Sequence, residues 1–325
     1  MRYRLRHTTS YSYSWAVDMS YHLLHLQLQS GPRQTVADCA VQTAPEGRMS
    51  DVCRDHFGNL VSHLAIEEPH TRFDVELTAE VDVLPFTAPP EAETPAWESI
   101  RDLLNGDGFP KAMEACEFAL GSPMAEADEA ITAYAAKSLP PGRPILAAAR
   151  ELTKRIHDDF RYDPSATEVF TPVAEAMKQR AGVCQDFAHL QIAMLRSHGL
   201  AARYVSGYIR TMQPGDEAGL RGADASHAWV SVWCGDAHGW IDLDPTNDLV
   251  VSEDHVTLAV GRDYNDISPV RGVVLGGGPH RVGVAVELLP LDAPPKPTQS
   301  QTQNQSQTQG QSQTQSIAPP STAKA

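Results

Sequence analysis

The chain of 325 residues is 42% hydrophobic and carries a formal net charge of −15, with a pI of about 5.2. That length suggests two domains plus further segments. The acidic charge argues against nucleic acid and against an anionic membrane surface as main partners, because both are negatively charged. No stretch approaches the roughly 20 apolar residues that a membrane-spanning helix needs.

The N-terminus and the cysteines indicate a cytoplasmic protein without cofactors. Residues 1–10 are basic but lack the apolar segment of a secretory signal peptide, so we expect a cytoplasmic location. The five cysteines are odd in number and form no CxxC pair, which favours neither a disulfide framework nor a zinc site. We therefore expect no metal and no cofactor.

Residues 1–85 are predicted to form an antiparallel, β-sandwich-like domain. Apolar and polar side chains alternate in segments such as 22–29 and 73–83, which is the period of half-buried strands. Turn signals such as Gly31-Pro32 separate these segments, and several short strands at this spacing are typical of a sandwich. The favoured interpretation of this domain is a scaffold.

A proline-rich connector and several helices are predicted for residues 86–142. Apolar residues recur with helical spacing at 97–104 and again at 125–136. Another helix is predicted at 145–160, and it opens a second domain at 143–290, which we expect to end in a β-strand. The sequence therefore predicts an α+β protein.

Residues 291–325 differ from the rest of the chain in composition. Between 299 and 315, Gln alternates with Ser and Thr, and apolar residues are missing. Such a segment cannot bury enough apolar surface to offset the entropy lost on ordering, so we expect a disordered tail. A dispensable tail is favoured over an interaction segment or a source of substrate glutamines.

Cys184 stands where a loop containing Gly182 meets a predicted helix. Apolar residues after it follow the 3.6-residue period of a half-buried helix. Gly199 can adopt the left-handed backbone conformation that commonly ends a helix. A helix N-terminus has unpaired N–H groups and favours negative charge, which stabilises a thiolate. Cys184 is therefore a candidate nucleophile.

Two strands after the cysteine carry a histidine and an aspartate. His227 begins one alternating strand, and Asp244 ends the next one before Pro245. If these strands pair through the turn at 234–238, His227 would face residue 245, and Asp244 would be within reach of the imidazole. A helix-borne cysteine facing a histidine–aspartate pair is the papain-like arrangement.

Each of these residues alone has an ordinary structural explanation. A cysteine at a helix start is most often structural, a strand histidine is usually a core or surface group, and Asp-Pro commonly ends a strand. Only the combination, in this order and spacing, favours a thiol enzyme. A metal site built from His189, His227 and Asp242 is poorly supported, since no HxxxH or HxH spacing is present.

Four sequence blocks resemble the bacterial transglutaminase-like family. They occur in order at 182–189 (GVCQDFAH), 201–208 (AARYVSGY), 224–230 (DASHAWV) and 239–247 (GWIDLDPTN). Residues 1–85 also resemble that family's N-terminal β domain. The resemblance implies that 143–290 is a papain-like, transglutaminase-like catalytic core, in which the helix bearing Cys184 packs on an antiparallel sheet.

The resemblance also implies roles for individual residues. The catalytic triad would be Cys184, His227 and Asp244; the aspartate before Pro-Thr is favoured over Asp242, which shares its strand face. Asp186 and His189 are interpreted as supporting groups or loop anchors. Tyr162 is a candidate donor to the oxyanion, beside the backbone N–H of Cys184, although a core tyrosine is an equal interpretation.

The expected activity is acyl transfer from amide bonds through a thioester. Members of this superfamily include peptidases, amidases and crosslinking enzymes, so the substrate is expected to be a peptide or protein amide. Hydrolysis is favoured over transamidation, because no amine-binding site is recognisable. A non-catalytic peptide-binding module is the alternative from another class, and the presence of all three triad residue types counts against it.

Overall fold

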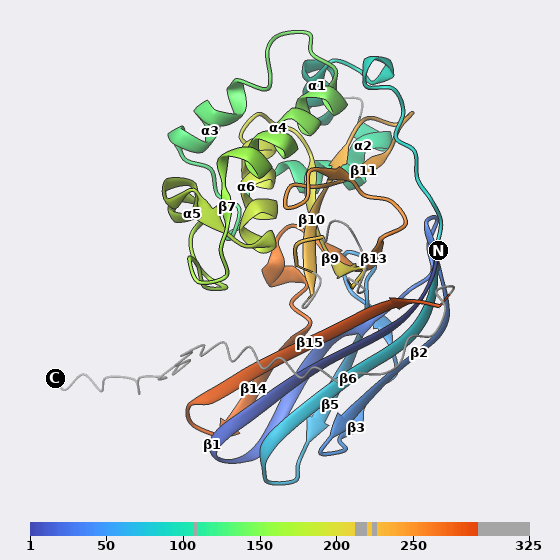
Figure 1. The fold of residues 1–325 in the computed structure, drawn as a ribbon, viewed down its shortest axis with the longest axis vertical. Coiled ribbons are helices and arrows are strands. Elements are labelled where there is room, and N and C mark those ends of the chain that lie inside the picture. Colours follow the sequence, from blue (N-terminus) through green and yellow to red (C-terminus); the bar gives the residue numbers. More distant parts are fainter. Residues whose placement is uncertain (107–108, 212–219, 223–225, 292–325) are drawn as a thin grey trace, which may run out of the picture.

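The computed structural model describes residues 1–106, 109–211, 220–222 and 226–291. A large curved sheet occupies one end of the molecule, and a unit of helices and a smaller sheet stands on it (Figure 1). Most of the loop predicted at 212–224, and the Gln/Ser/Thr-rich tail beyond residue 291, lie outside the described residues. Within the described part of the chain, no helix is long and apolar enough to cross a lipid bilayer.

The large sheet contains eight strands, and all its pairings are antiparallel. Its strands are β1 (Arg2–Gln27), β2 (Gln34–Ala44), β3 (Arg48–Met49), β4 (Cys53–Arg54), β5 (Leu60–Ile66), β6 (His70–Val83), β14 (Val270–Gly276) and β15 (His280–Pro290). The predicted N-terminal antiparallel β domain is therefore confirmed.

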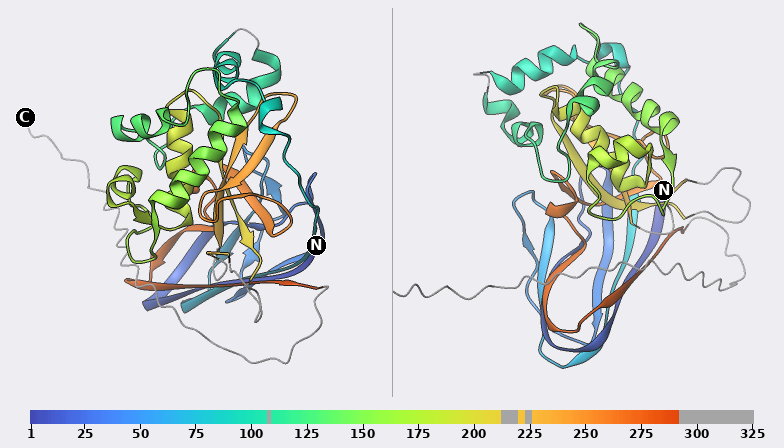
Figure 2. Two further views of the ribbon diagram at one scale, coloured as in Figure 1. Left: turned by 45° about the horizontal axis from the view of Figure 1, so that its top comes forward. Right: turned by 90° about the vertical axis from the view of Figure 1, so that its left-hand side faces the viewer.

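The long strand β1 organises this sheet because its two halves have different neighbours. Its first half pairs with β6 and β15, whereas its second half pairs with β5 and β14. The register shifts between the two halves, and such irregularities bend a strand. The sheet consequently curves, as Figure 2 shows from two further directions.

The last two strands, β14 and β15, join the large sheet. The sequence alone predicts that residues 270–290 belong to the second domain, which is expected to end in a strand. Alternation predicts that a segment is a strand, but it does not say which strand is its partner. Here the partner is β1: Tyr3 pairs with Pro290 at one end of the β1–β15 ladder and Tyr13 with His280 at the other. The domain boundaries themselves stay a prediction.

The second unit combines helices with a five-stranded sheet in the order β12-β11-β10-β9-β13. The sheet strands are β9 (Ala202–Ile209), β10 (His227–Trp233), β11 (Trp240–Asp244), β12 (Leu249–Val250) and β13 (His255–Gly261). The helices and remaining short elements are η1 (Glu91–Glu93), α1 (Trp97–Asn105), α2 (Phe109–Cys116), η2 (Glu117–Ala119), α3 (Glu129–Ala136), α4 (Ile145–Asp159), β7 (Arg161–Tyr162), α5 (Val173–Gln179), β8 (Ala181–Gly182), α6 (Cys184–Arg196) and η3 (Tyr264–Asp266). The predicted α+β class is confirmed.

Helix α6 is the centre of this unit. It packs against β9 and β10 on one side and against α3, α4 and α5 on the other, so nearly all its residues are buried. A polar side chain in such a place needs partners. The amide nitrogen of Gln191 has two, because Nε2 donates to Ala149 O at 3.1 Å and to Thr153 Oγ1 at 2.8 Å. A helix buried on all sides is held rigidly, which favours precise placement of its first residue.

Two amide side chains of the large sheet join it to the edge strand β13. Gln34 donates to Thr257 O at 2.8 Å and accepts from Thr257 N at 2.9 Å. Asn59 donates to Val260 O and accepts from Val260 N, both at 2.8 Å. Each amide thus pairs with a peptide group as a neighbouring strand would. The two units are therefore joined by hydrogen bonds of defined geometry.

Candidate active site

Cys184 is the first residue of α6, as the sequence predicts. Val183 before it is extended, and Cys184 itself is buried, with 8% of its surface exposed. Gly182 leaves room for the turn: a β-carbon there would lie 2.6 Å from Asp186 Oδ2. The thiol therefore lies at a helix N-terminus whose N–H groups favour a thiolate.

Asp186 supports the turn that presents Cys184. Its Oδ2 atom accepts hydrogen bonds from Val183 N at 2.8 Å and from Thr167 Oγ1 at 2.6 Å. Burial raises the pKa of Asp186, and these hydrogen bonds oppose part of that rise. Gln185 adds a hydrogen bond from Nε2 to Val169 O at 2.7 Å. The start of α6 is thus tied to the preceding loop, which is the anchoring geometry predicted for Asp186.

His227 and Asp244 meet at one end of the core sheet. Strands β10 and β11 pair with Val230 opposite Leu243, one residue away from the predicted register. Continued, this register sets Asp244 opposite Trp229, on the same face as His227 and diagonal to it. His227 Nε2 lies 2.9 Å from Asp244 Oδ2, and both side chains are completely buried. The predicted histidine–aspartate contact is therefore present, although the predicted register is off by one.

The Asp244 carboxylate collects donors on both of its oxygens. Oδ1 accepts from the backbone N–H groups of Thr246 at 2.9 Å and Asn247 at 3.3 Å. Oδ2 accepts from His227, from Asn247 Nδ2 at 2.8 Å and from His255 Nε2 at 3.2 Å. Burial alone would raise the pKa of Asp244, but the charge of His227 and the hydrogen bonds from His227 and His255 hold it far below its usual range. Asp244 is therefore a buried, ionised anchor.

The second nitrogen of His227 is directed away from Asp244 and is available to the thiol. A carboxylate only accepts hydrogen bonds, so Nε2 carries the hydrogen that binds Asp244, and Nδ1 is left for Cys184. Burial lowers the pKa of His227, but the charge of Asp244 and then the Cys184 thiol outweigh it and raise the pKa. Nδ1 is buried without a hydrogen bond of ordinary length to any described residue. Such contacts are commonly long before substrate binds.

Asp242, the other aspartate of β11, has partners other than His227. Its Oδ2 accepts from Trp229 Nε1 at 3.4 Å and is 3.6 Å from Arg33 Nη1. Arg33 also donates to Val251 O at 2.6 Å and lies over the Phe86 ring. Asp242 thus helps to connect the core sheet with the turn before β2, and the geometry pairs His227 with Asp244.

Tyr162 and His189 are near the thiol but have different surroundings. Tyr162 pairs with Gly182 in the short β7–β8 ladder, and its ring packs edge-on against Phe187. The role of Tyr162 as an oxyanion donor stays a prediction. His189 is buried: its Nε2 accepts from Tyr264 N at 3.2 Å, and its ring stacks on Tyr204. Burial lowers the pKa of His189 to about 4, so it is a neutral packing group at neutral pH.

Gly222, which no motif in the sequence marks, closely approaches His227. A β-carbon on Gly222 would lie 2.7 Å from His227 Nδ1, and its φ of +89° suits glycine alone. The neighbouring Arg221 is held by Asn247, which accepts from Arg221 N at 2.8 Å and donates to Arg221 O at 3.3 Å. Asn247 therefore connects this backbone with Asp244.

His255 is a second residue of the site that the sequence does not predict. It begins β13 and contacts both Asp244 and Trp229, whose ring lies edge-on at 5.2 Å. The available signal was weak, since a histidine opening an alternating strand is common. One possible ligand atom from each of His227, Asp244 and His255 lies within 4.8 Å of the other two, a spacing compatible with metal ligation. Both Nε2 atoms, however, carry hydrogens directed at Asp244, whereas metal ligands need free lone pairs there.

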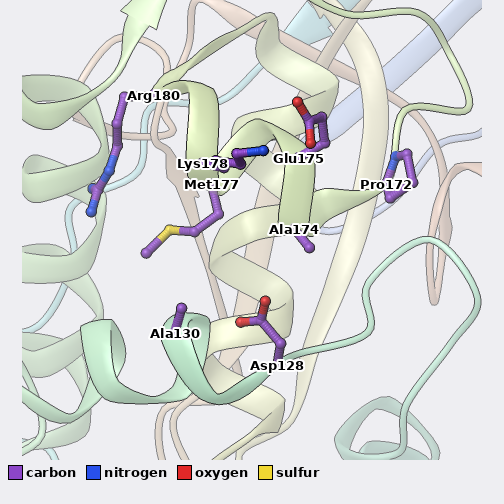
Figure 3. A pocket seen from close by; sticks show the side chains of 8 residues that line it. All are labelled: Asp128, Ala130, Pro172, Ala174, Glu175, Met177, Lys178 and Arg180. Carbon is purple, nitrogen blue, oxygen red and sulfur yellow. The ribbon is translucent and has the colours of Figure 1, made fainter.

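A surface pocket of about 660 Å³ lies apart from this site. Figure 3 shows its lining side chains, which come from α3 and α5 and from the residues next to them; Asp128, Met177 and Arg180 are among them. None of the triad residues lines it. It is therefore not the place where Cys184 would meet a substrate.

Comparisons with known proteins agree with this geometry. Residues 132–245 match the transglutaminase-like superfamily, and residues 3–82 match the bacterial transglutaminase-like N-terminal region. An uncharacterized protein of Mycobacterium tuberculosis is 37% identical over 300 residues, which cover 90% of this chain and 93% of that protein. The chain belongs to the bacterial transglutaminase-like family.

Two further comparisons extend this result. An uncharacterized protein of Mycobacterium leprae is 32% identical over 287 residues, covering 88% of this chain and 98% of that protein. The crystal structure of a candidate cysteine protease from Cytophaga hutchinsonii aligns with a TM-score of 0.68 and 22% identity, covering 93% of this chain and 94% of that chain. At this identity the likeness shows the fold, and the papain-like, transglutaminase-like core is confirmed.

Proposed function

We propose that this member of the transglutaminase-like superfamily is a cysteine-dependent acyl-transfer enzyme that cleaves amide bonds in a peptide or protein. The observation that carries the proposal is the placement of His227 between a buried, ionised Asp244 and the thiol at the start of α6. A non-catalytic module would have no use for a buried charged pair beside a cysteine, because burying such a pair has a desolvation cost. The cytoplasmic location expected from the sequence stays a prediction.

The proposed reaction begins with an ion pair between the Cys184 thiolate and the His227 imidazolium. Sulfur attacks the carbonyl carbon and forms a C–S bond, while charge develops on the carbonyl oxygen near the N-terminus of α6. His227 then gives its Nδ1 proton to the departing nitrogen as the C–N bond breaks, which leaves a thioester. Water then attacks the thioester carbonyl carbon and gives a proton to His227. The C–S bond breaks, which releases the acid product and the Cys184 thiolate.

Hydrolysis is the proposed fate of the thioester. Cys184 is 8% exposed and His227 only 1%, so a small acceptor has easier access than the side chain of a second protein. The backbone of Gly222 packs beside His227 Nδ1 and further limits the space through which an acceptor can reach this nitrogen. Transamidation follows the same chemistry up to the thioester, and product analysis with and without an added primary amine distinguishes the two.

The proposal is tested by the alkylation rate of Cys184 with iodoacetamide between about pH 4 and pH 10, compared in the wild type and His227→Ala. Cys53 is exposed and supplies an internal reference in every digest. We expect Cys184 to react fast at acidic pH, where ordinary thiols are protonated, and to lose this reactivity in the variant. Equal rates in the two proteins, following an ordinary thiol titration, would contradict the proposal.

A further inference from the structure

One oxygen atom of Asp244 accepts hydrogen bonds from two histidines. His227 Nε2 lies 2.9 Å and His255 Nε2 lies 3.2 Å from Asp244 Oδ2. All three side chains are at most 2% exposed, so water does not share these contacts. Only His227 has a place in the reaction proposed above, which leaves the second imidazole without a function.

We propose that His255 is a positioning residue that holds the Asp244 carboxylate in the orientation that His227 needs. The inference rests on the proposed function, since it concerns the same triad. It assigns His255 no contact with substrate and no transfer of a proton.

The orientation of the carboxylate depends on donors at both oxygens. The backbone N–H groups of Thr246 and Asn247 fix Oδ1. Asn247 Nδ2 and His255 Nε2 both donate to Oδ2, and the same oxygen also accepts from His227 Nε2. Without such donors an aspartate carboxylate can rotate about its Cβ–Cγ bond, because the torsion angle of that bond has only a broad preference. The His255 hydrogen bond therefore opposes rotation of the very oxygen that holds His227.

His255 is itself rigidly placed. It pairs with Ile209 at the start of β13, and its ring packs edge-on against Trp229, which is completely buried. A donor fixed by a strand and a packed indole transmits this rigidity to Asp244. Donors with locked rotamers are what a preorganised site requires.

A purely space-filling role would not explain a histidine here. His255 Nδ1 is buried and has no partner among the residues that the structure describes, so the ring keeps one polar atom unsatisfied. Phenylalanine would fill similar volume without that cost. In its Nε2–H tautomer His255 donates to Asp244 without adding a net charge. A charged donor would oppose the positive charge of His227, whose ring centre is 6.0 Å away.

The test compares full-length wild type, His255→Phe and His255→Gln, the second of which keeps an N–H donor. His22→Phe is the matched control, because His22 is a buried histidine of the large sheet that stacks on Phe73. Two quantities are measured: the NMR signals of ¹⁵N-labelled histidines, and the alkylation rate of Cys184 relative to Cys53. Urea unfolding confirms that each variant is folded.

We expect wild-type His255 to be the Nε2–H tautomer. His255→Phe should shift the His227 Nε2–H signal and slow Cys184 alkylation about tenfold, as expected for losing a hydrogen bond to a charged group. His255→Gln should restore most of the rate, and His22→Phe should change neither quantity.

Three results would overturn the inference: an Nδ1–H tautomer of His255, equal losses in the Phe and Gln variants, or an unchanged His227 signal in folded His255→Phe. The tautomer is read in the wild type, so it decides the contact even if a variant does not fold. If wild-type Cys184 is no more reactive than Cys53, the proposed function fails instead. In that case the NMR signals still decide whether His255 positions Asp244.

Discussion

Gly222 lies so close to His227 that a β-carbon on the glycine would be 2.7 Å from the imidazole Nδ1. Alanine at this position must therefore displace the nitrogen that faces Cys184. We predict that Gly222→Ala slows Cys184 alkylation about a hundredfold, because small misplacements of reacting groups have large effects on rate. The relative alkylation of Cys184 and Cys53, read by mass spectrometry, measures this change.

The matched control is Gly239→Ala in the turn between β10 and β11. Gly239 also has a positive φ, of +64°, but a β-carbon there would meet no atom within 4 Å. It should lose about 1 kcal/mol of stability from backbone strain and keep the Cys184 rate. Similar rates in the two glycine variants would show that contact with His227 does not matter.

The two aspartates of β11 should differ sharply in their effect. Asp244→Asn replaces the anion that holds His227, so we expect Cys184 alkylation to fall at least about tenfold. Asp242→Asn affects Trp229 and Arg33 and should leave the rate within about twofold while lowering stability modestly. Rates of alkylation and urea midpoints for both variants check this, and a larger rate loss in Asp242→Asn would reverse the assignment of the triad.

The protonation of His227 provides a pH-dependent prediction. Because its pKa is raised by Asp244 and by Cys184, the imidazole should keep its proton as the pH rises through about 6.5, where a free histidine loses it. Asp244→Asn should lower the pKa most, and Cys184→Ala should lower it less, in the order of the two charge effects. NMR titration of ¹⁵N-labelled His227 measures this, and a wild-type pKa at or below 6.5 would contradict it.

Gln34 and Asn59 should stabilise the protein through the backbone of β13. Truncating either side chain to alanine removes two hydrogen bonds to a partly buried peptide group, with an expected loss of about 1–3 kcal/mol in the free energy of unfolding. Gln42→Ala is the control, since Gln42 is exposed on β2 and should change stability by less than about 0.5 kcal/mol. Urea unfolding of the three variants tests the difference.

Local patterns in the sequence predicted the elements that carry the triad. Helical spacing after Cys184 predicted α6, and alternation predicted the strands of His227 and Asp244. Their contact followed from a tight turn between neighbouring strands, although the register was off by one residue. These features depend on residues close in sequence, which is why they could be predicted.

Contacts between distant segments could not be predicted in this way. Gln34 and Asn59 reach β13 across about 200 residues of sequence, and an isolated amide has no periodic pattern. The same holds for Gly222 beside His227, since a loop glycine usually marks only a turn. The partner of β15 could not be predicted for a similar reason, because alternation is equally compatible with every sheet in the molecule.

The pairing of β15 with β1 makes the core an insertion within the large sheet. The chain leaves this sheet after β6, builds the helices and the smaller sheet, and returns to it with β14 and β15. A single break in the connector at 84–90 would therefore produce two interlocked fragments, the second supplying two strands to the sheet of the first. The two fragments of such a split protein should stay together as one particle, because β14 and β15 of the second fragment pair with β1 of the first.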